Sequence, residues 1–250
     1  MRLALIRNTV ANVIRLRRFP AICVFVLSLM IGHLGTAQTT DDFGSWFSYN
    51  TAGKLNAYDE ESKLRWWFDG HLRFLDDSGG FTQSILRPGL GYQLTENTTA
   101  WLGYAWINTL PPSGAPVFDE SRFWQQLLWS NKVGQQTLFS RSRLEQRWVE
   151  TGDDTGWRFR QFVKSDRPFC EGSPWSFVAW DEAFFDLNVT DWGQQGSLSQ
   201  NRLFLGLGRK LNGANKPKFE IGYLNQFERR KSAPGDRFNH IVSANWFFTF

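Results

Sequence analysis

The sequence predicts an all-β fold, an antiparallel transmembrane β-barrel of 10–12 strands of the bacterial outer-membrane type. Three observations predict this fold. The chain begins with the layout of a secretory signal peptide. The rest is rich in aromatic residues but has no long apolar run, and its segments alternate between apolar and polar residues over unusual lengths. We therefore expect two parts, a signal peptide at residues 1–37 and one barrel domain at residues 38–250.

The expected signal peptide has three consecutive regions. Arg15, Arg17 and Arg18 form a basic region, an apolar run extends over residues 21–34, and Ala37 is a small residue suited to cleavage. An uncleaved N-terminal anchor is the alternative, but the apolar run is shorter than the roughly 20 residues of a spanning helix. Export to the outer membrane is therefore the expected localisation.

The excess of basic residues belongs to the expected signal peptide. The chain has 28 Lys and Arg against 24 Asp and Glu, but the first 37 residues contain five arginines and no acidic residue. A mature chain starting after Ala37 is close to neutral, so no nucleic-acid partner is expected. It also retains Cys170 as its one cysteine, which excludes an intrachain disulfide.

Aromatic content separates this chain from an ordinary soluble protein. It has 13 Trp and 23 Phe in 250 residues, yet only 42% hydrophobic residues. In a membrane barrel the lipid-facing and lumen-facing residues alternate along each strand, so one face is strongly apolar while the mean hydropathy stays low. The composition fits that pattern.

The clearest strand is residues 63–74, where Leu64, Trp66 and Phe68 share one face and Arg65, Asp69 and Arg73 share the other. Turn-forming sequences separate the other expected strands. These are residues 43–52, 84–94, 99–109, 119–132, 136–150, 155–165, 174–187, 198–210, 219–227 and 238–250. The count is eleven, but single-chain bacterial barrels have even strand numbers, so ten or twelve is expected. Segment 43–52 is the weakest and is alternatively a periplasmic or plug segment.

The last segment ends on an aromatic residue. Val242, Ala244, Trp246, Phe248 and Phe250 share one face, and the pattern resembles the C-terminal signal that the barrel assembly machinery recognises. Trp246, Phe247, Phe248 and Phe250 are expected in an aromatic girdle at the periplasmic interface. The alternative is the closing strand of a soluble sheet. The expected partners are thus the assembly machinery and outer-membrane lipid, with the oligomeric state left open.

Charged side chains are expected inside the barrel if the alternation is right. The expected lumen charge cluster is Arg65, Asp69, Arg73, Glu120, Arg122, Arg141, Arg143, Glu145, Arg147, Arg158, Arg160, Glu182 and Arg202, with His71 and Arg87 on the same faces. Arginines and carboxylates on adjacent strands can pair across the ladder. The cluster either fills and rigidifies a narrow lumen or lines a passage for an anion, and the sequence leaves both open.

The order of several short motifs resembles a known family. They are Trp46, Gly103-Tyr104, Glu120-x-Arg122 with Gln125-Gln126, Arg143-Leu-Glu145-Gln-Arg147, Arg158-x-Arg160, Asp181-Glu182 and Gly222-Tyr223-Leu224. They resemble the bacterial outer-membrane barrels catalogued as domain of unknown function 2490. The resemblance covers residues 43–250 and implies a barrel in the outer membrane. It implies no established activity and no catalytic residues.

A membrane-embedded lipid-modifying hydrolase is the runner-up function, and it depends on two histidines. His240 and Ser243 are three residues apart, which places them on opposite faces of a strand. His71 lies beside Asp69 and Arg73 on the expected lumen face. Its role there is either a member of a hydrogen-bonded network or a catalytic base, and the sequence leaves both alternatives open. No metal-ligand spacing or cofactor fingerprint is present, so neither is expected. A soluble secreted β protein is the third alternative.

Overall fold

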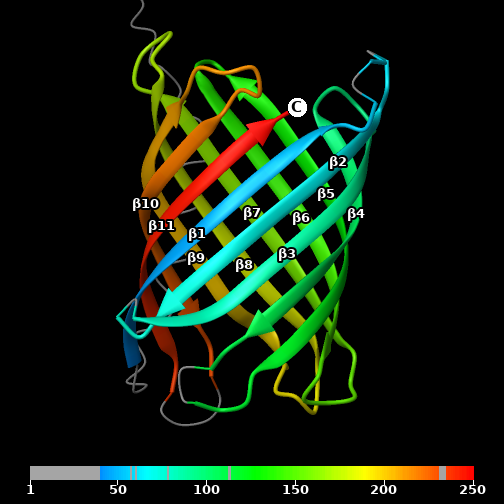
Figure 1. The fold of residues 1–250 in the computed structure, drawn as a ribbon, viewed down its shortest axis with the longest axis vertical. Helices are drawn as coiled ribbons and strands as arrows, with labels where there is room; N and C mark the ends of the chain where they lie inside the picture. Colours follow the sequence, from blue (N-terminus) through cyan, green and yellow to red (C-terminus); the bar gives the residue numbers. More distant parts are fainter. Residues whose placement is uncertain (1–39, 57, 60, 78, 112–113, 231–234) are drawn as a thin grey trace, which may run out of the picture. The chain divides into compact units, whose positions relative to one another are not determined.

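A computed structural model describes residues 40–250 except 57, 60, 78, 112–113 and 231–234; the expected signal peptide lies outside the described residues. The described chain forms a closed β-barrel of eleven strands (Figure 1). In chain order these are β1 (Thr40–Lys54), β2 (Leu64–Leu75), β3 (Gly80–Gln93), β4 (Thr98–Thr109), β5 (Phe118–Val133), β6 (Gln136–Val149), β7 (Gly156–Pro168), β8 (Trp175–Val189), β9 (Gln195–Lys210), β10 (Lys218–Glu228) and β11 (Arg237–Thr249). The predicted all-β barrel is confirmed.

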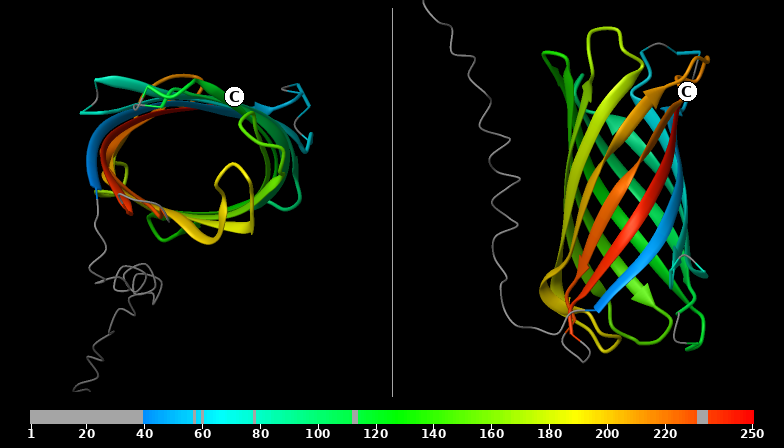
Figure 2. Two further views of the ribbon diagram at one scale, coloured as in Figure 1. Left: turned by 90° about the horizontal axis from the view of Figure 1, so that it is seen from below. Right: turned by 90° about the vertical axis from the view of Figure 1, so that its left-hand side faces the viewer.

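The strands are longer than those of most soluble sheets. They run from 11 residues in β10 to 16 residues in β5 and β9, against about 5–6 in typical globular proteins. Each pairs with its sequence neighbours, and the strands are steeply tilted (Figure 1). Seen along the barrel axis, the wall is oval (Figure 2).

The barrel closes through a parallel pair of strands. β1 pairs with β11 in parallel register from Thr40↔Arg237 to Ala52↔Thr249, whereas the ten other pairings are antiparallel. The expectation of an even strand number is therefore wrong, and the eleven counted segments are the eleven strands. With an odd number, the first and last strands run in the same direction and must meet in parallel.

The weakest predicted segment, 43–52, belongs to the wall. As β1 it forms two full ladders, one with β11 and one with β2. Trp46 and Ser48 are buried on its inner face, while Phe47 and Tyr49 are exposed on its outer face. The alternation is thus that of a barrel strand, and the alternative of a plug is wrong.

The distribution of burial is inverted relative to a soluble protein. Among the described residues, the buried set contains 12 hydrophobic and 23 polar or charged residues. Large hydrophobic side chains are instead exposed along the outer wall, as for Leu90 at 61% and Leu102 at 54%. A wall of this kind, apolar outside and polar inside, is suited to lipid on one side and water on the other.

Exposed aromatic residues lie near both ends of the outer wall. At the end where β11 finishes, they include Tyr92, Trp129, Trp175 and Phe250. At the opposite end, where β1 begins, they include Phe43, Phe81, Trp148 and Trp157. Two such bands flanking an apolar zone are the pattern of aromatic girdles at membrane interfaces.

The last strand shows which of its predicted girdle residues face outward. Val242, Trp246 and Phe250 are exposed on the outer face, and Trp246 packs on Phe219 with ring centres 4.6 Å apart. Phe247 was predicted to join them, but it faces the lumen, where Lys164 Nζ lies 4.7 Å from its ring centre. Alternation requires this because Phe247 follows the outward Trp246.

Two connecting loops are tied together at the end of the barrel where β1 begins. The carboxylate of Asp191, between β8 and β9, accepts hydrogen bonds from the backbone N–H groups of Asp153 (2.8 Å) and Asp154 (3.2 Å), between β6 and β7. These bonds, of which the one from Asp153 has the largest effect, hold the pKa of Asp191 below its usual range.

The described part of the chain contains no helix that is long and apolar enough to cross a membrane.

Candidate functional site

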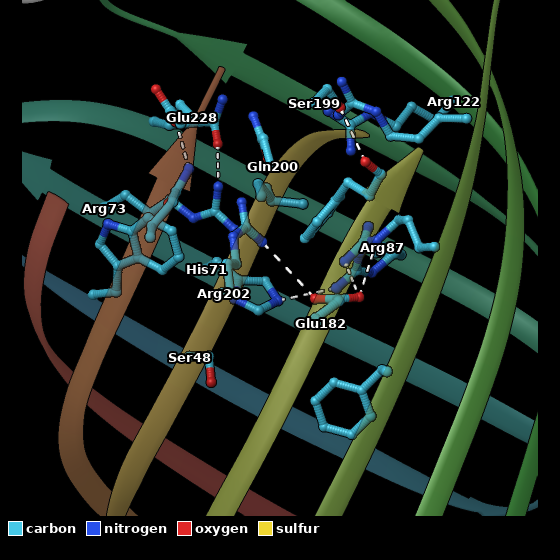
Figure 3. Close-up of a pocket in the computed structure, with 18 of the residues that line it drawn as sticks. Ser48, His71, Arg73, Arg87, Arg122, Glu182, Ser199, Gln200, Arg202 and Glu228 are labelled. Atoms are coloured by element: carbon cyan, nitrogen blue, oxygen red, sulfur yellow. Dashed lines mark hydrogen bonds and ion pairs between the residues drawn. The ribbon is translucent and has the colours of Figure 1, made fainter. Parts of the chain in front are cut away.

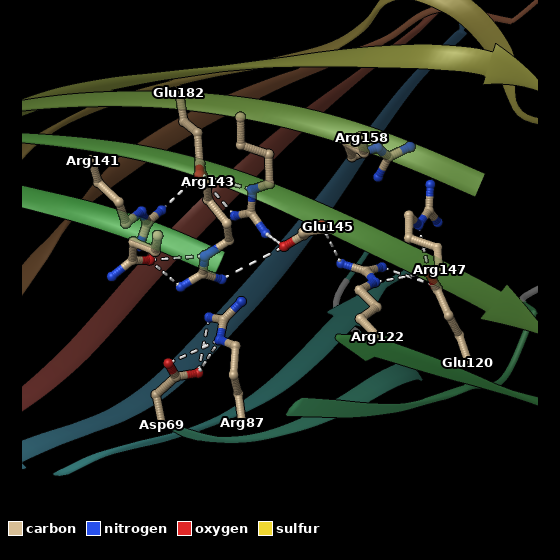
Figure 4. A network of polar contacts seen from close by, with 12 residues as sticks. Asp69, Arg87, Glu120, Arg122, Arg141, Arg143, Glu145, Arg147, Arg158 and Glu182 are labelled. Carbon is tan, nitrogen blue, oxygen red and sulfur yellow. Dashed lines mark hydrogen bonds and ion pairs between the residues drawn. The ribbon is translucent and has the colours of Figure 1, made fainter. Parts of the chain in front are cut away.

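The candidate site is the barrel lumen, which holds a cavity of about 1010 Å³. Its charged side chains come from the inward positions of most of the strands, because alternate residues of each strand point inward. We call the following residues the arginine network: Arg73, Arg87, Arg122, Arg141, Arg143, Arg147, Arg158, Arg160 and Arg202, with Asp69, Glu120, Glu145, Glu182 and Asp186. Nine guanidinium groups thus face five carboxylates. Figure 4 shows much of the network.

Glu145 on β6 contacts three arginines of the network. Its Oε1 lies 2.6 Å from Arg160 Nη1 and 3.6 Å from Arg143 Nη1, and its Oε2 lies 3.4 Å from Arg122 Nη1. Its side chain is 1% exposed. Three cations on β5, β6 and β7 therefore share one buried carboxylate, and its loss would leave buried positive charge without a partner.

Glu182 on β8 also contacts three arginines, and it shares Arg160 with Glu145. Its Oε1 lies 2.6 Å from Arg141 Nη2 and 2.8 Å from Arg160 Nη2, whereas its Oε2 is 4.0 Å from Arg202 Nη1. Arg160 on the intervening strand β7 bridges the two carboxylates Glu145 and Glu182. Charge pairing therefore continues from β5 to β9 across the inner wall.

Glu120 on β5 holds two arginines near the end of the barrel where β1 begins. Arg122 reaches it through two bonds of 2.8 Å, and Arg147 Nε lies 2.5 Å from its Oε1. Arg147 also donates to Gln194 at 3.2 Å and stacks 4.9 Å from the centre of the Trp192 ring. The tied loop between β8 and β9 thus contacts the arginine network directly.

Asp69 and Asp186 each pair with an arginine on a neighbouring strand. Asp69 is fully buried and accepts from Arg87 Nε at 3.0 and 2.9 Å, and Arg158 Nε lies 2.6 Å from Asp186. His71 Nε2 is 2.9 Å from Asp69 Oδ1 and 3.2 Å from Arg87 Nη2. The Nε2 atom of His71 therefore contacts both members of the Asp69–Arg87 ion pair.

The hydrolase alternative gains no support from the histidines. Ser48 lies opposite His71 in the β1–β2 register, but its hydroxyl donates to Asn245 at 2.6 Å. His240 faces outward and bonds to the Tyr223 hydroxyl at 2.6 Å, while Ser243 is buried on the inner face. The prediction that His240 and Ser243 lie on opposite faces is confirmed.

Trp124 and Arg143 fill one side of the lumen. The indole of Trp124 lies flat against the inner wall because Gly89 and Gly103 have no side chains there, and a Cβ at either position would overlap its ring. The Arg143 guanidinium stacks 4.5 Å from this ring centre and bonds to Gln126 Oε1 at 2.8 and 2.6 Å. Arg143 and Trp124 are both 0% exposed, so this part is packed.

Arg73 and Arg202 face the cavity with little compensating charge. Both stack on Trp46, at 4.0 and 4.9 Å from its ring centre, and they lie close together in Figure 3. Among the described residues no carboxylate lies within ion-pair distance of Arg73, which donates to Gln83 at 2.7 Å. The Nε atoms of both have no hydrogen-bond partner. Two arginine side chains therefore line the cavity with fewer close acceptors than the rest of the arginine network has.

A second, balanced charge cluster lies toward the other end of the lumen. Glu220 Oε1 is 2.6 Å from Lys164 Nζ and 2.8 Å from Lys218 Nζ, and Lys218 also pairs with Asp166. Two lysines face two carboxylates here. This cluster adds no net charge, so the excess of positive charge belongs to the arginine network.

The structure brings together every residue of the predicted cluster except one. Arg65 lies near the end of the barrel, where it bonds to Gln93 and to the backbone oxygen of Ser62. Sequence reasoning omitted Asp186, Lys164 and Glu220. Asp186 had a usable signal, because it shares the face of Glu182 and lies directly opposite Arg158 in register. The described residues contain no group of side chains suited to a metal ion.

Comparison with known proteins supports the resemblance. The family described as "Protein of unknown function (DUF2490)" matches residues 43–239. An uncharacterised protein of Methylorubrum extorquens is 36% identical over 174 residues, covering 67% of this chain and 73% of that protein. No solved structure gives a significant match.

Proposed function

The chain belongs to the DUF2490 family, whose description gives no role, and from the geometry of the barrel we propose that it is an outer-membrane protein with an anion-selective lumen. The inverted burial and the two aromatic bands support placement in a membrane. A signal peptide at residues 1–37 and outer-membrane lipid around the wall belong to the same proposal.

One observation carries the anion selectivity. Arg73 and Arg202 line the cavity, and neither has a carboxylate closer than 4.0 Å. A guanidinium group binds carboxylates and phosphates through paired hydrogen bonds. A mobile anion that enters the cavity therefore meets the excess positive charge of the arginine network, whereas a cation meets repulsion.

Reconstitution into planar bilayers under a KCl gradient tests the proposal. We expect the reversal potential to have the sign of chloride permeation, and the double variant Arg73→Gln, Arg202→Gln to lose most of this selectivity. Arg65→Gln is the matched control because Arg65 lies outside the arginine network. The absence of conductance, cation selectivity, or equal effects of the double variant and the control would contradict an anion-selective passage.

Cell fractionation tests the location separately. We expect the protein in the outer-membrane fraction as a folded barrel whose gel mobility changes on heating. Recovery in the soluble periplasm would overturn the membrane placement and the passage together.

A further inference from the structure

The outer wall carries a polar belt that an apolar lipid environment does not explain. Gln125, Ser142, Gln161 and Asp181 lie near the middle of β5, β6, β7 and β8, on the outward side of each strand. These four residues define the polar belt. At mid-height of a spanning barrel there is no water to solvate such groups.

The belt residues bond across neighbouring strands. Gln125 exchanges two bonds with Gln146, at 2.8 and 3.0 Å. Ser142 donates to Gln161 Oε1 at 2.6 Å. Asp181 accepts from Asn201 Nδ2 at 3.2 and 3.1 Å. These hydrogen bonds leave some donors and acceptors of the belt without a partner.

The unpaired hydrogen-bonding groups differ between the β5–β6 side of the belt and the β8 side. A carboxamide has two N–H groups, and Gln125 and Gln146 each use one of them in their mutual pair. Asp181 accepts from a single amide, and among the described residues no cation lies within ion-pair distance of it. Spare donors therefore lie on β5 and β6, and spare acceptors lie on β8. An ionised group in this position is costly in lipid.

The opposite wall carries a smaller outward polar cluster, in which His240 and Asn225 both bond to the Tyr223 hydroxyl. The outward residues of β11 include Val242 and Trp246, and those of β1 include Phe47 and Tyr49, all of them exposed. In Figure 1, β11 and β1 lie in front and β6 and β7 behind, so the two walls are on opposite sides of the barrel. The four residues of the polar belt thus lie on one side of the barrel, on β5 to β8.

We propose that the polar belt is the contact surface for a second copy of this chain, related by a two-fold axis that runs parallel to the barrel axis at β6 and β7. This inference rests on the proposed membrane placement. Such an axis places β8 of one copy against β5 of the other, since the contact is isologous. The spare acceptors of Asp181 then meet the spare donors of Gln125, twice in the dimer. The surface is complementary to itself, which favours a second copy over an unrelated protein.

Cysteine cross-linking in native membranes tests the contact. In a background with Cys23→Ala and Cys170→Ser, we expect Gln161→Cys, next to the proposed axis, to form disulfide-linked dimers on mild oxidation. Val242→Cys on the opposite wall is the matched control and should stay monomeric. Failure of Gln161→Cys to cross-link, equal cross-linking of both variants, or a product with another protein would overturn the proposal.

A second variant shows whether the polar groups drive association. Replacing both Gln125 and Asp181 by Leu makes the wall purely apolar at these points, and we expect dimer association in detergent to weaken by about tenfold or more. An unchanged association would overturn the proposal. Heat-dependent gel mobility confirms that the variant barrel is folded. A folded monomer in the membrane fraction refutes only the dimer, whereas recovery of the wild-type chain in the soluble fraction refutes the proposed function as well.

Discussion

Glu145→Gln is the sharpest single test of the arginine network. The side chain keeps its shape but loses its charge, and the carboxylate it removes is the shared partner of Arg160, Arg143 and Arg122 at 2.6, 3.6 and 3.4 Å. Because Glu145 is 1% exposed, water does not replace the lost charge. Removing one partner of a buried ion pair typically costs about 3–5 kcal/mol.

The remaining contacts determine where in that range the loss falls. Arg160 keeps Glu182 at 2.8 Å, and Arg122 keeps Glu120 at 2.8 Å. Arg143 keeps only the neutral Gln126. One of three cations therefore loses its one carboxylate, and we expect the free energy of unfolding to fall by about 3 kcal/mol, at the lower end of the range.

Urea unfolding in lipid vesicles, followed by tryptophan fluorescence, measures this change. Glu150→Gln is the control, because Glu150 lies in an exposed turn and surface substitutions usually change stability by less than about 0.5 kcal/mol. A loss for Glu145→Gln no larger than that of the control would refute the stabilisation of the barrel by the arginine network.

Two further predictions concern the packed side of the lumen and the loops. Gly103→Val places a side chain where the Trp124 ring lies, so we expect a loss of about 1–3 kcal/mol in urea unfolding; an unchanged midpoint would contradict the packing. The lowered pKa of Asp191 means that its bonds to Asp153 and Asp154 stabilise the loops at neutral pH and are lost as the pH falls through that lowered value. Hydrogen exchange of these two amides should therefore become less protected at acidic pH, and Asp191→Asn should abolish this dependence; equal behaviour of both proteins would contradict it.

The sequence predicted the wall better than its closure. Period-two alternation depends only on local order, so all eleven strands and their inward faces were recognisable, including Arg158 and Arg160 on β7. The count of eleven segments was right, but the rule of even strand numbers led to the wrong expectation of ten or twelve strands. Alternation within β1 carries no information on whether its partner β11 runs parallel or antiparallel, because that depends on the closed ring.

The sequence also predicts only some of the contacts between side chains in the lumen. Arg158 and Asp186 lie directly opposite on adjacent strands, so register alone predicts their pair. Arg141 and Glu182 lie on β6 and β8, and their bond spans the intervening strand. Trp46 on β1 and Arg202 on β9 are far apart in sequence, and they meet inside the lumen although β10 and β11 separate their strands. Such contacts depend on the curvature of the wall and the reach of long side chains.

The proposed membrane placement would account for the charged interior of the barrel. A soluble protein of this size would bury its apolar side chains, but here they cover the outside, so the interior cannot be stabilised by apolar packing alone. Glu145 and Glu182 instead link arginines of β5 to β9 along the inner wall. The same pairing leaves Arg73 and Arg202 without close carboxylates beside the cavity. If conductance changes with these two residues while stability does not, stabilisation and selectivity reside in different parts of one network.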